Sequence, residues 1–293
     1  MSRNELPQKH PKLAIIMPLL LLTLASYPAR VQAQLARSPL APSSGRSALR
    51  SSASLSHSNI VANTPIHLAQ NFPDEGDPKG RRRGGTSRRE GCPNLKTPIT
   101  ALVPGEETNG TSFLASTVAE YPTFWVYVPE LPTNFRSGEF VLQDEQENDV
   151  WRTPLTLPEK SGAIAISLPP NRKYALKQDL KYHWFFRVYC GEPQNKPEYF
   201  FVDAWVQRVA MTPDLQRQLA TAKPREYTAY AAHNVWYDAV TNLAELRSTN
   251  PGVSEVPPQE VRVLAQEWTN LLKAVGLEEL AQAPIVQRYS PQQ

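Results

Sequence analysis

The alternation of hydrophobic and polar positions is clearest between residues 92 and 211. There, short runs of β-branched and aromatic residues recur between Pro, Gly and Asn, with no helical period separating them. Such runs predict strands, and we expect seven, at residues 99–103, 123–128, 139–143, 150–157, 163–168, 182–189 and 199–209. Seven short strands at this spacing are typical of an antiparallel β-sandwich of the immunoglobulin or fibronectin type III kind.

Two local signals refine the predicted sandwich. The polar segment 145–148 predicts a hairpin turn between the third and the fourth strand. Pro154 predicts that the fourth strand lies at a sheet edge or a bulge, because proline cannot donate a hydrogen bond to a β-ladder.

The last two strands each have a second face that is rich in aromatic residues. In both strands the even-numbered residues form the core face and the odd-numbered residues the opposite one. That opposite face holds Phe185 and Tyr189 in one strand, and Phe201 and Trp205 in the other. Because it is too aromatic for bare solvent, we expect helices to cover it or a ligand to bind there.

Helical signals begin at Thr212, a candidate N-cap that a proline follows. Residues 225–248 have a spacing similar to one tetratricopeptide hairpin, and a further amphipathic helix ends at Gly276. We therefore expect a unit of three to four helices over residues 212–280, packed on the sandwich of residues 92–211 in an α+β fold. Residues 281–293 would form a flexible tail.

The first residues of the chain look like a targeting segment. Basic residues precede an apolar stretch at 13–24, and small residues at 31 and 33 indicate a cleavage site after residue 33. A twelve-residue helix covers about 18 Å, less than the roughly 30 Å of a bilayer core. We predict a signal peptide over residues 1–33 that is cleaved and leaves no stable membrane span; an uncleaved tether is the alternative.

Residues 34–91 predict a disordered linker, because they are rich in Ser, Ala, Pro and Arg and contain no Trp, Tyr or Cys. The linker has nine basic and four acidic residues, whereas residues 92–293 have 18 basic and 23 acidic residues. Its last part includes Arg81, Arg82 and Arg83, a cluster that can contact phosphate, acidic polysaccharide or anionic lipid. A solvated linker and one that folds back on the acidic body are alternatives. Since no aromatic residues interleave with the arginines, we expect no specific nucleic-acid binding.

Cys92 and Cys190 are the two cysteines of the chain. In an exported protein an even cysteine count favours a disulfide, and closing a loop of this length stabilises the fold by about 4–5 kcal/mol in the chain-entropy model. The alternative is a cysteine nucleophile paired with His183 or His233, although Cys190 lies on the aromatic core face.

Other motifs that carry chemistry are few. The histidines show no pair at metal-ligand spacing, and the acidic turn at 144–149 lacks the pattern of an EF-hand, so we expect no metal and no cofactor. Asp203 is the one acid that we would examine for glycoside hydrolysis, with a bond to a helix N-terminus or to Arg208 as the alternative. The sequence has no phosphate-binding loop and no nucleophile elbow, which favours a protein that is not an enzyme.

Several short sequence motifs occur in a fixed order along the chain. They are the Arg and Gly run ending in Gly91 and Cys92, followed by residues 100–104, 122–129, 140–144, 182–184, 236–239 and 272–277. In these motifs the chain resembles the exported cyanobacterial proteins that carry domain of unknown function 928. The resemblance covers about residues 81–277, and Glu90 departs from it by interrupting the Arg and Gly run. It implies a cyanobacterial envelope or lumenal location and no known activity.

Together these observations predict a non-enzymatic binding or scaffold module of the cell envelope that recognises a protein or a polysaccharide. The module would be exported to the periplasm, the thylakoid lumen or the extracellular space. The aromatic surplus of the sandwich and the helical hairpin are the features that favour binding. The alternative is an envelope glycan hydrolase that uses an acidic residue such as Asp203.

Overall fold

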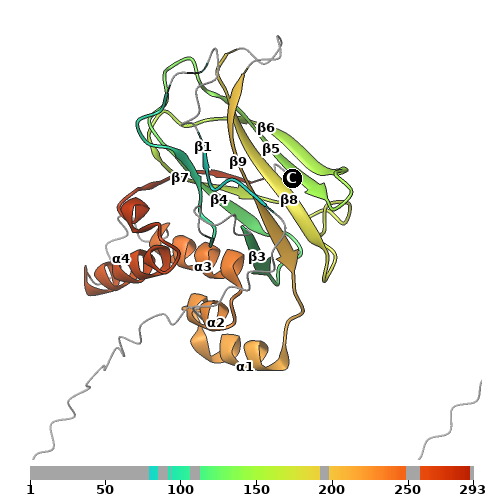
Figure 1. Cartoon of the computed structure of the whole chain (residues 1–293). Coiled ribbons are helices and arrows are strands. Elements are labelled where there is room, and N and C mark those ends of the chain that lie inside the picture. Colours follow the sequence, from blue (N-terminus) through green and yellow to red (C-terminus); the bar gives the residue numbers. More distant parts are fainter. Residues whose placement is uncertain are drawn as a thin grey trace, which may run out of the picture. The chain divides into compact units, whose positions relative to one another are not determined.

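The computed structural model describes residues 79–84, 92, 94–105, 113–191, 198–248 and 258–290, all within one unit of the chain, Val61–Gln293. Its strands form two five-stranded sheets (Figure 1), a first sheet ordered β1-β2-β4-β7-β10 and a second sheet ordered β3-β9-β8-β5-β6. The strands are β1 (Arg83–Gly84), β2 (Ile99–Ala101), β3 (Leu114–Thr117), β4 (Thr123–Val128), β5 (Ser137–Asp144), β6 (Asp149–Thr156), β7 (Gly162–Ser167), β8 (Lys181–Tyr189), β9 (Tyr199–Arg208) and β10 (Ile285–Tyr289).

All seven predicted strands are present, as β2 and as β4 to β9, and their ends differ from the prediction by at most two residues. The predicted turn at 145–148 joins β5 to β6. Pro154 lies in β6, which is the last strand of the second sheet, so its expected place at an edge is confirmed.

The two sheets face each other across an aromatic core. In β8, Trp184 and Phe186 are fully buried and the residues on either side of them are partly exposed, as the alternation predicts. Phe124 of the first sheet meets Phe140 and Trp184 of the second sheet at ring-centre distances of 4.9 and 5.6 Å. Burying each such side chain stabilises the fold by about 1.5–3 kcal/mol, so this layer holds the sheets together.

The prediction of a wholly antiparallel sandwich is wrong at two edges. β3 runs parallel to β9 in the second sheet, and β10 runs parallel to β7 in the first. β10 also occupies the segment that we expected to be a flexible tail, of which only residues 291–293 lie outside the described residues. Because β10 follows the helices in the chain, the helical unit is inserted between strands of one sheet rather than appended to a finished sandwich.

The ordered chain also begins earlier than predicted. β1 pairs with β2, and Arg81 forms a β-bridge with Asp203 of β9, so residues 79–84 connect the two sheets. Gly84 permits this close approach, because a Cβ at that position would clash with the carbonyl group of Phe201. The predicted signal peptide and the remainder of the predicted linker lie outside the described residues.

The helices of the described residues are α1 (Pro213–Ala222), α2 (Tyr227–Ala232), α3 (Trp236–Ser248) and α4 (Pro258–Lys273), followed by the 3₁₀ helix η2 (Glu278–Leu280). Thr212 caps α1 as predicted, since its hydroxyl accepts a hydrogen bond from the backbone N–H of Leu215 at 3.2 Å. Gly276 follows α4 with a φ of 69°, the left-handed conformation that glycine adopts at helix ends.

α3 connects the helical unit to both sheets, because it packs against β3 and β4. The indole N–H of Trp236 donates to the carbonyl oxygen of Leu102 at 2.8 Å. The Tyr237 hydroxyl accepts a hydrogen bond from the indole of Trp184 at 2.8 Å and is fully buried with it in the core. The expectation that the helices pack on the sandwich is therefore confirmed for α3.

Cys92 and Cys190 form the predicted disulfide, with Cα atoms 5.3 Å apart. The bond joins the beginning of the sandwich to the residue that follows β8. The protein thus has a mixed α+β fold with two five-stranded sheets and C-terminal helices. In the part of the chain that the structure describes, none of the helices is long and apolar enough to span a bilayer.

Candidate functional site

The outer face of the second sheet carries the four aromatic residues that the sequence singled out. Phe185 and Tyr189 of β8 lie beside Phe201 and Trp205 of β9, and each side chain is partly exposed. Figure 1 shows the helices gathered at one end of the sheets, where α3 contacts β3 and β4. The described helices therefore leave these side chains accessible. We call the surface formed by these four residues the outer aromatic face.

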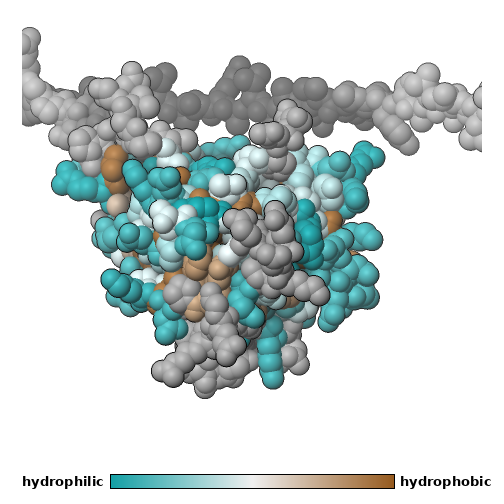
Figure 2. All heavy atoms as spheres, turned by 90° about the horizontal axis from the view of Figure 1, so that it is seen from above, coloured by the Kyte–Doolittle hydropathy of each residue, from teal (hydrophilic) through white to brown (hydrophobic). Residues whose placement is uncertain are grey.

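The end of the sheets away from the helices has a different character. Figure 2 shows this end as mostly hydrophilic, with hydrophobic residues confined to small patches where the surface is not covered by grey atoms. A broad apolar surface is the usual mark of an interaction site. The visible part of this end does not offer one, so the outer aromatic face is the stronger candidate.

Arginine side chains are stacked on the rings of the outer aromatic face. The guanidinium carbon of Arg187 lies 5.6 Å from the ring centre of Phe185, and that of Arg81 lies 4.5 Å from the ring centre of Phe201. Beneath this layer Val141 of β5 is completely buried, although it points away from the main core. The outer face is therefore a packed layer with defined side-chain positions rather than a set of loose side chains.

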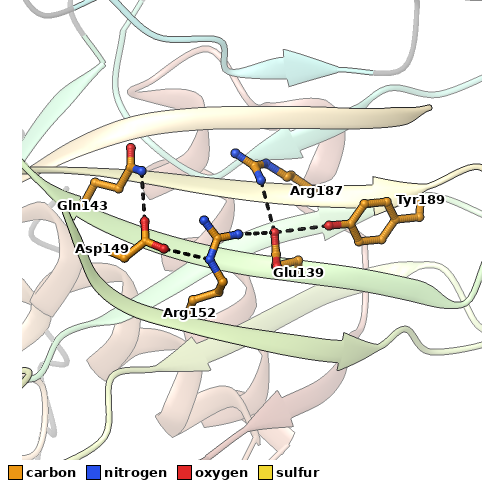
Figure 3. A network of polar contacts seen from close by, with 6 residues as sticks. All are labelled: Glu139, Gln143, Asp149, Arg152, Arg187 and Tyr189. Atoms are coloured by element: carbon orange, nitrogen blue, oxygen red, sulfur yellow. Dashed lines mark hydrogen bonds and ion pairs between the residues drawn. The ribbon is translucent and has the colours of Figure 1, made fainter. Parts of the chain in front are cut away.

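Glu139 of β5 is the centre of a polar network beside the outer aromatic face (Figure 3). Its Oε2 accepts hydrogen bonds from Nη1 of Arg152 at 2.6 Å, from Nη1 of Arg187 at 3.1 Å and from the Tyr189 hydroxyl at 3.2 Å. Burial, together with the negative charge of Glu139, raises the pKa of Tyr189 above its usual value of 10.0. The phenol therefore stays protonated and keeps its hydrogen bond to the carboxylate over the physiological pH range.

The network continues toward the hairpin turn through Asp149. This carboxylate accepts hydrogen bonds from Nε of Arg152 at 2.8 Å and from Nε2 of Gln143 at 3.0 Å, and these bonds lower the pKa of Asp149. At the turn itself, hydrogen bonds from the side chain and backbone of Asn148 lower the pKa of Asp144. These two carboxylates of the predicted acidic turn therefore stabilise the hairpin through hydrogen bonds.

Asp203 lies in the middle of the outer face and is bonded to a histidine. Nε2 of His183 donates a hydrogen bond to Oδ2 of Asp203 at 2.7 Å. The same imidazole stacks on Trp205, with ring centres 4.2 Å apart and planes 10° apart. Arg208, which we considered as an alternative partner of Asp203, instead contacts Glu120 at 3.0 Å. The partner of the Asp203 carboxylate is His183.

The partners of the two acids on this face give little support to glycoside hydrolysis. Such an enzyme needs a second carboxyl group about 5–10 Å from the first. Glu139 is on the same face, but it lies two strands from Asp203 and two residues along, since Arg187 pairs with both Glu139 and Phe201. With strands about 4.8 Å apart and a rise of about 3.3 Å per residue, the two Cα atoms are roughly 12 Å apart. Both carboxylates also have partners already: Arg152, Arg187 and Tyr189 bind Glu139, and His183 binds Asp203.

The three predicted binding arginines form parts of the fold. Arg82 is buried, and its Nη1 donates to the carbonyl oxygen of Val275 at 2.7 Å. Arg83 forms an ion pair with Glu279, and Arg81 belongs to the outer face described above. The interpretation of a segment that folds back on the body therefore holds for these residues, whereas the later arginines of the cluster lie outside the described residues.

A second candidate site is a cavity of about 220 Å³ between the end of β3 and helices α2 and α3. Asp238 lines it, and its Oδ2 accepts hydrogen bonds from the Thr117 hydroxyl at 2.6 Å and the backbone N–H of Val118 at 3.2 Å. Desolvation by burial raises the pKa of Asp238 to about 6. Glu226 and Tyr230 also line the cavity, and none of the described residues that line it is basic.

The remaining chemical candidates are excluded or unsupported. Both cysteines are bonded to each other, so neither is available as a nucleophile. His233 approaches Asp214 at 3.5 Å rather than a cysteine. Across the described ranges, no group of three or more His, Cys, Asp or Glu side chains is arranged to hold a metal ion.

The polar network of Figure 3 was not predicted from the sequence. Alternation in β5 places Glu139 and Gln143 on one face, but it does not reveal which strands lie beside β5. The signal was present in β8, where Arg187 stands between aromatic residues on the outer face. An arginine at that position favours a carboxylate on the neighbouring strand, because opposite charges across a sheet attract.

Comparison with known proteins assigns the chain to one family. A search of the curated proteins found no match. A family model described as Domain of Unknown Function (DUF928) matches residues 83–285, which include strands β1 to β9, all the helices described above and the first residue of β10. The chain therefore belongs to the family defined by this domain of unknown function.

Proposed function

We propose that the chain is a non-enzymatic binding module whose outer aromatic face contacts a partner protein. The observation that carries this proposal is that Phe185, Tyr189, Phe201 and Trp205 stay partly exposed on one sheet face, stacked with arginine side chains. Tyr, Trp and Arg are the residue types that contribute most to protein interfaces. Because these side chains are already held in place, binding a partner costs them less conformational entropy.

The stacking supports a protein partner over a polysaccharide, both of which the sequence left open. Guanidinium groups already lie over the rings of Phe185 and Phe201, so a sugar would have to displace them in order to stack there. A protein can instead form hydrogen bonds to the guanidinium edges and pack against the ring edges. The predicted alternative, a glycan hydrolase that uses Asp203, is favoured by no observation at the site.

We propose further that the protein is exported, to the periplasm, the thylakoid lumen or the outside of a cyanobacterial cell. The disulfide supports this location, because such bonds persist mainly in oxidising compartments. The cleaved signal peptide of residues 1–33 is part of the same proposal. We also propose that the sheets resemble an immunoglobulin or fibronectin type III sandwich and that the helices resemble a tetratricopeptide hairpin.

Photo-crosslinking from the outer aromatic face tests the binding proposal. The full chain is expressed in its native cells with a photoreactive phenylalanine derivative in place of Tyr189. The control carries the derivative at Arg217 of α1, whose side chain is 78% exposed. After irradiation we expect a discrete protein adduct from position 189, identified by mass spectrometry, and no such adduct from position 217.

Each other outcome has a definite meaning. Adducts that consist of polysaccharide would replace the protein partner by a glycan and contradict the stacking argument. The absence of any adduct from position 189, or the same adducts from both positions, would show that the outer aromatic face is not a specific binding surface.

A further inference from the structure

The free edge of the first sheet is a second feature with a binding geometry. β10 is the last strand in its sheet and, among the described strands, pairs only with β7. An edge of this kind presents backbone N–H and C=O groups to which another strand can pair. Proteins often protect such edges with proline, as Pro154 does in the edge strand β6, but Ile285–Tyr289 contains none.

A groove of about 550 Å³ lies beside this edge. Residues 284–288 form one side of it, and Arg247 and Ser248 in the last turn of α3 form another. Ile285 and Val286 are partly exposed there. The groove thus combines a strand edge, apolar side chains and a hydroxyl group, which are the contacts that an extended peptide uses when it adds to a sheet.

The charged residues that line this groove in the described part of the chain are Arg247 and Arg288, and none of the described lining residues is acidic. The guanidinium carbon of Arg247 lies 4.8 Å from the ring centre of Trp268, and its Nη1 is buried without a hydrogen-bond partner in the described part of the chain. Arg288 donates a hydrogen bond to Ser248 at 3.0 Å and has Glu245 at 3.6 Å, an exposed pair that contributes little energy.

We propose that β10 and this groove bind an extended, acidic peptide segment of a partner protein as an additional strand. Backbone hydrogen bonds to β10 would supply affinity, and a carboxylate of the peptide on Arg247 and Arg288 would supply specificity. The groove is lined by β10 of the first sheet, whereas the outer aromatic face belongs to the second. This site is therefore independent of the function proposed above, and either can fail without the other.

Three matched peptides test the proposal by fluorescence anisotropy with the full chain. The first is a fluorescein-labelled octapeptide of alternating Thr and Val with one central Glu. The second has Lys in place of Glu, and the third is the Glu peptide with N-methyl groups on alternate backbone amides, which removes its strand-pairing donors. We expect saturable binding of the first peptide, at least about tenfold weaker binding of the second, and loss of binding by the third.

A charge reversal locates the site. Arg288→Glu places a carboxylate where the peptide carboxylate binds. Because the guanidinium carbon of Arg288 lies 5.4 Å from the ring centre of Trp125, a urea unfolding curve checks that the variant is folded. We expect the variant to bind the Glu peptide about tenfold more weakly and the Lys peptide more tightly than the unaltered chain does. Arg217→Glu, a reversal on the exposed surface of α1, is the control and should change neither affinity.

Hydrogen exchange with the Glu peptide bound supplies the position directly. We expect the bound peptide to slow exchange in β10. Slower exchange in β8 and β9 instead would show that the peptide binds the outer aromatic face and would overturn this proposal. Equal binding of all three peptides, or an affinity that Arg288→Glu leaves unchanged, would also overturn it. So would the absence of saturable binding by the Glu peptide.

Discussion

Asp238 carries a titration that opposes folding. Its pKa rises from 3.8 to about 6 in the folded protein because burial penalises the charged form. The folded state therefore holds a proton more tightly than the unfolded state does, and stability falls as the pH rises from about 4 to about 6. Above about pH 6 the charged carboxylate lowers the free energy of unfolding by about 3 kcal/mol, which corresponds to a shift of about two pKa units.

We expect Asp238→Asn to remove this pH dependence. The amide oxygen can still accept the hydrogen bonds from Thr117 and Val118, but it carries no charge. Urea unfolding should show the variant up to about 3 kcal/mol more stable than the unaltered chain at pH 7, and of similar stability at pH 4. Asp214→Asn on the exposed surface of α1 is the control. A variant that is less stable at pH 7 would contradict this account of Asp238.

Arg82 and Arg83 are neighbours with unlike roles, which allows a matched comparison. Arg82 is buried and donates to the carbonyl oxygen of Val275, whereas Arg83 is partly exposed and pairs with Glu279. We expect Arg82→Met to lower the free energy of unfolding by about 2 kcal/mol, since a buried carbonyl group loses a charged donor. Arg83→Met should cost less than about 1 kcal/mol. Equal effects in thermal or urea unfolding would contradict the structural role of Arg82.

At the residue scale, the sequence was informative about the disulfide, the N-cap and the aromatic positions. It did not reveal the partners of Asp203 and Glu139, because a hydrogen bond between strands depends on register and strand order. Alternation shows which face a side chain occupies and nothing about what lies across the sheet.

Among the elements, β10 makes the sharpest prediction. Ending the chain after Ala283 removes β10 and exposes the edge of β7, with which it pairs. Three partly buried apolar side chains, Ile285, Val286 and Tyr289, would be lost, so we expect a loss of about 3 kcal/mol in urea unfolding. Ending the chain after Ser290 is the control and should have no measurable effect. A flexible tail, as first expected from the sequence, would make the two truncations alike.

With the exception of β2, which has three residues, the strands found from the sequence were those long enough to show a period. β8 and β9 have nine and ten residues and alternate cleanly, so their positions were correct. β1, β3 and β10 have two, four and five residues, and a run of that length shows little alternation. Their pairing depends on neighbours that are distant in sequence, such as Trp205 of β9 for Leu114 of β3, and tertiary packing decides it.

For the whole molecule, the disulfide closes a loop over 98 residues. Replacing Cys92 and Cys190 together by Ala should lower the free energy of unfolding by about 4 kcal/mol, because the unfolded chain regains the entropy that the cross-link removes. Reduction of the unaltered chain should give a similar loss in urea unfolding. If the double variant were as stable as the oxidised chain, the disulfide would have no part in holding the sandwich together.

The central claim is that the outer aromatic face serves binding, whereas the opposite face of the same strands serves folding. Two adjacent residues of β9 separate these roles, since Phe201 is partly exposed on the outer face and Val202 is fully buried in the core. The most direct measurement compares Phe201→Thr with Val202→Thr, each for its free energy of unfolding and for its adduct from the photoreactive position 189.

We expect Phe201→Thr to abolish the adduct and to change stability by less than about 1 kcal/mol, because threonine suits an exposed strand position. Val202→Thr should keep the adduct and lose about 2 kcal/mol, because it buries a hydroxyl group in the core. An adduct that survives Phe201→Thr, together with a stability loss as large as that of Val202→Thr, would contradict the claim.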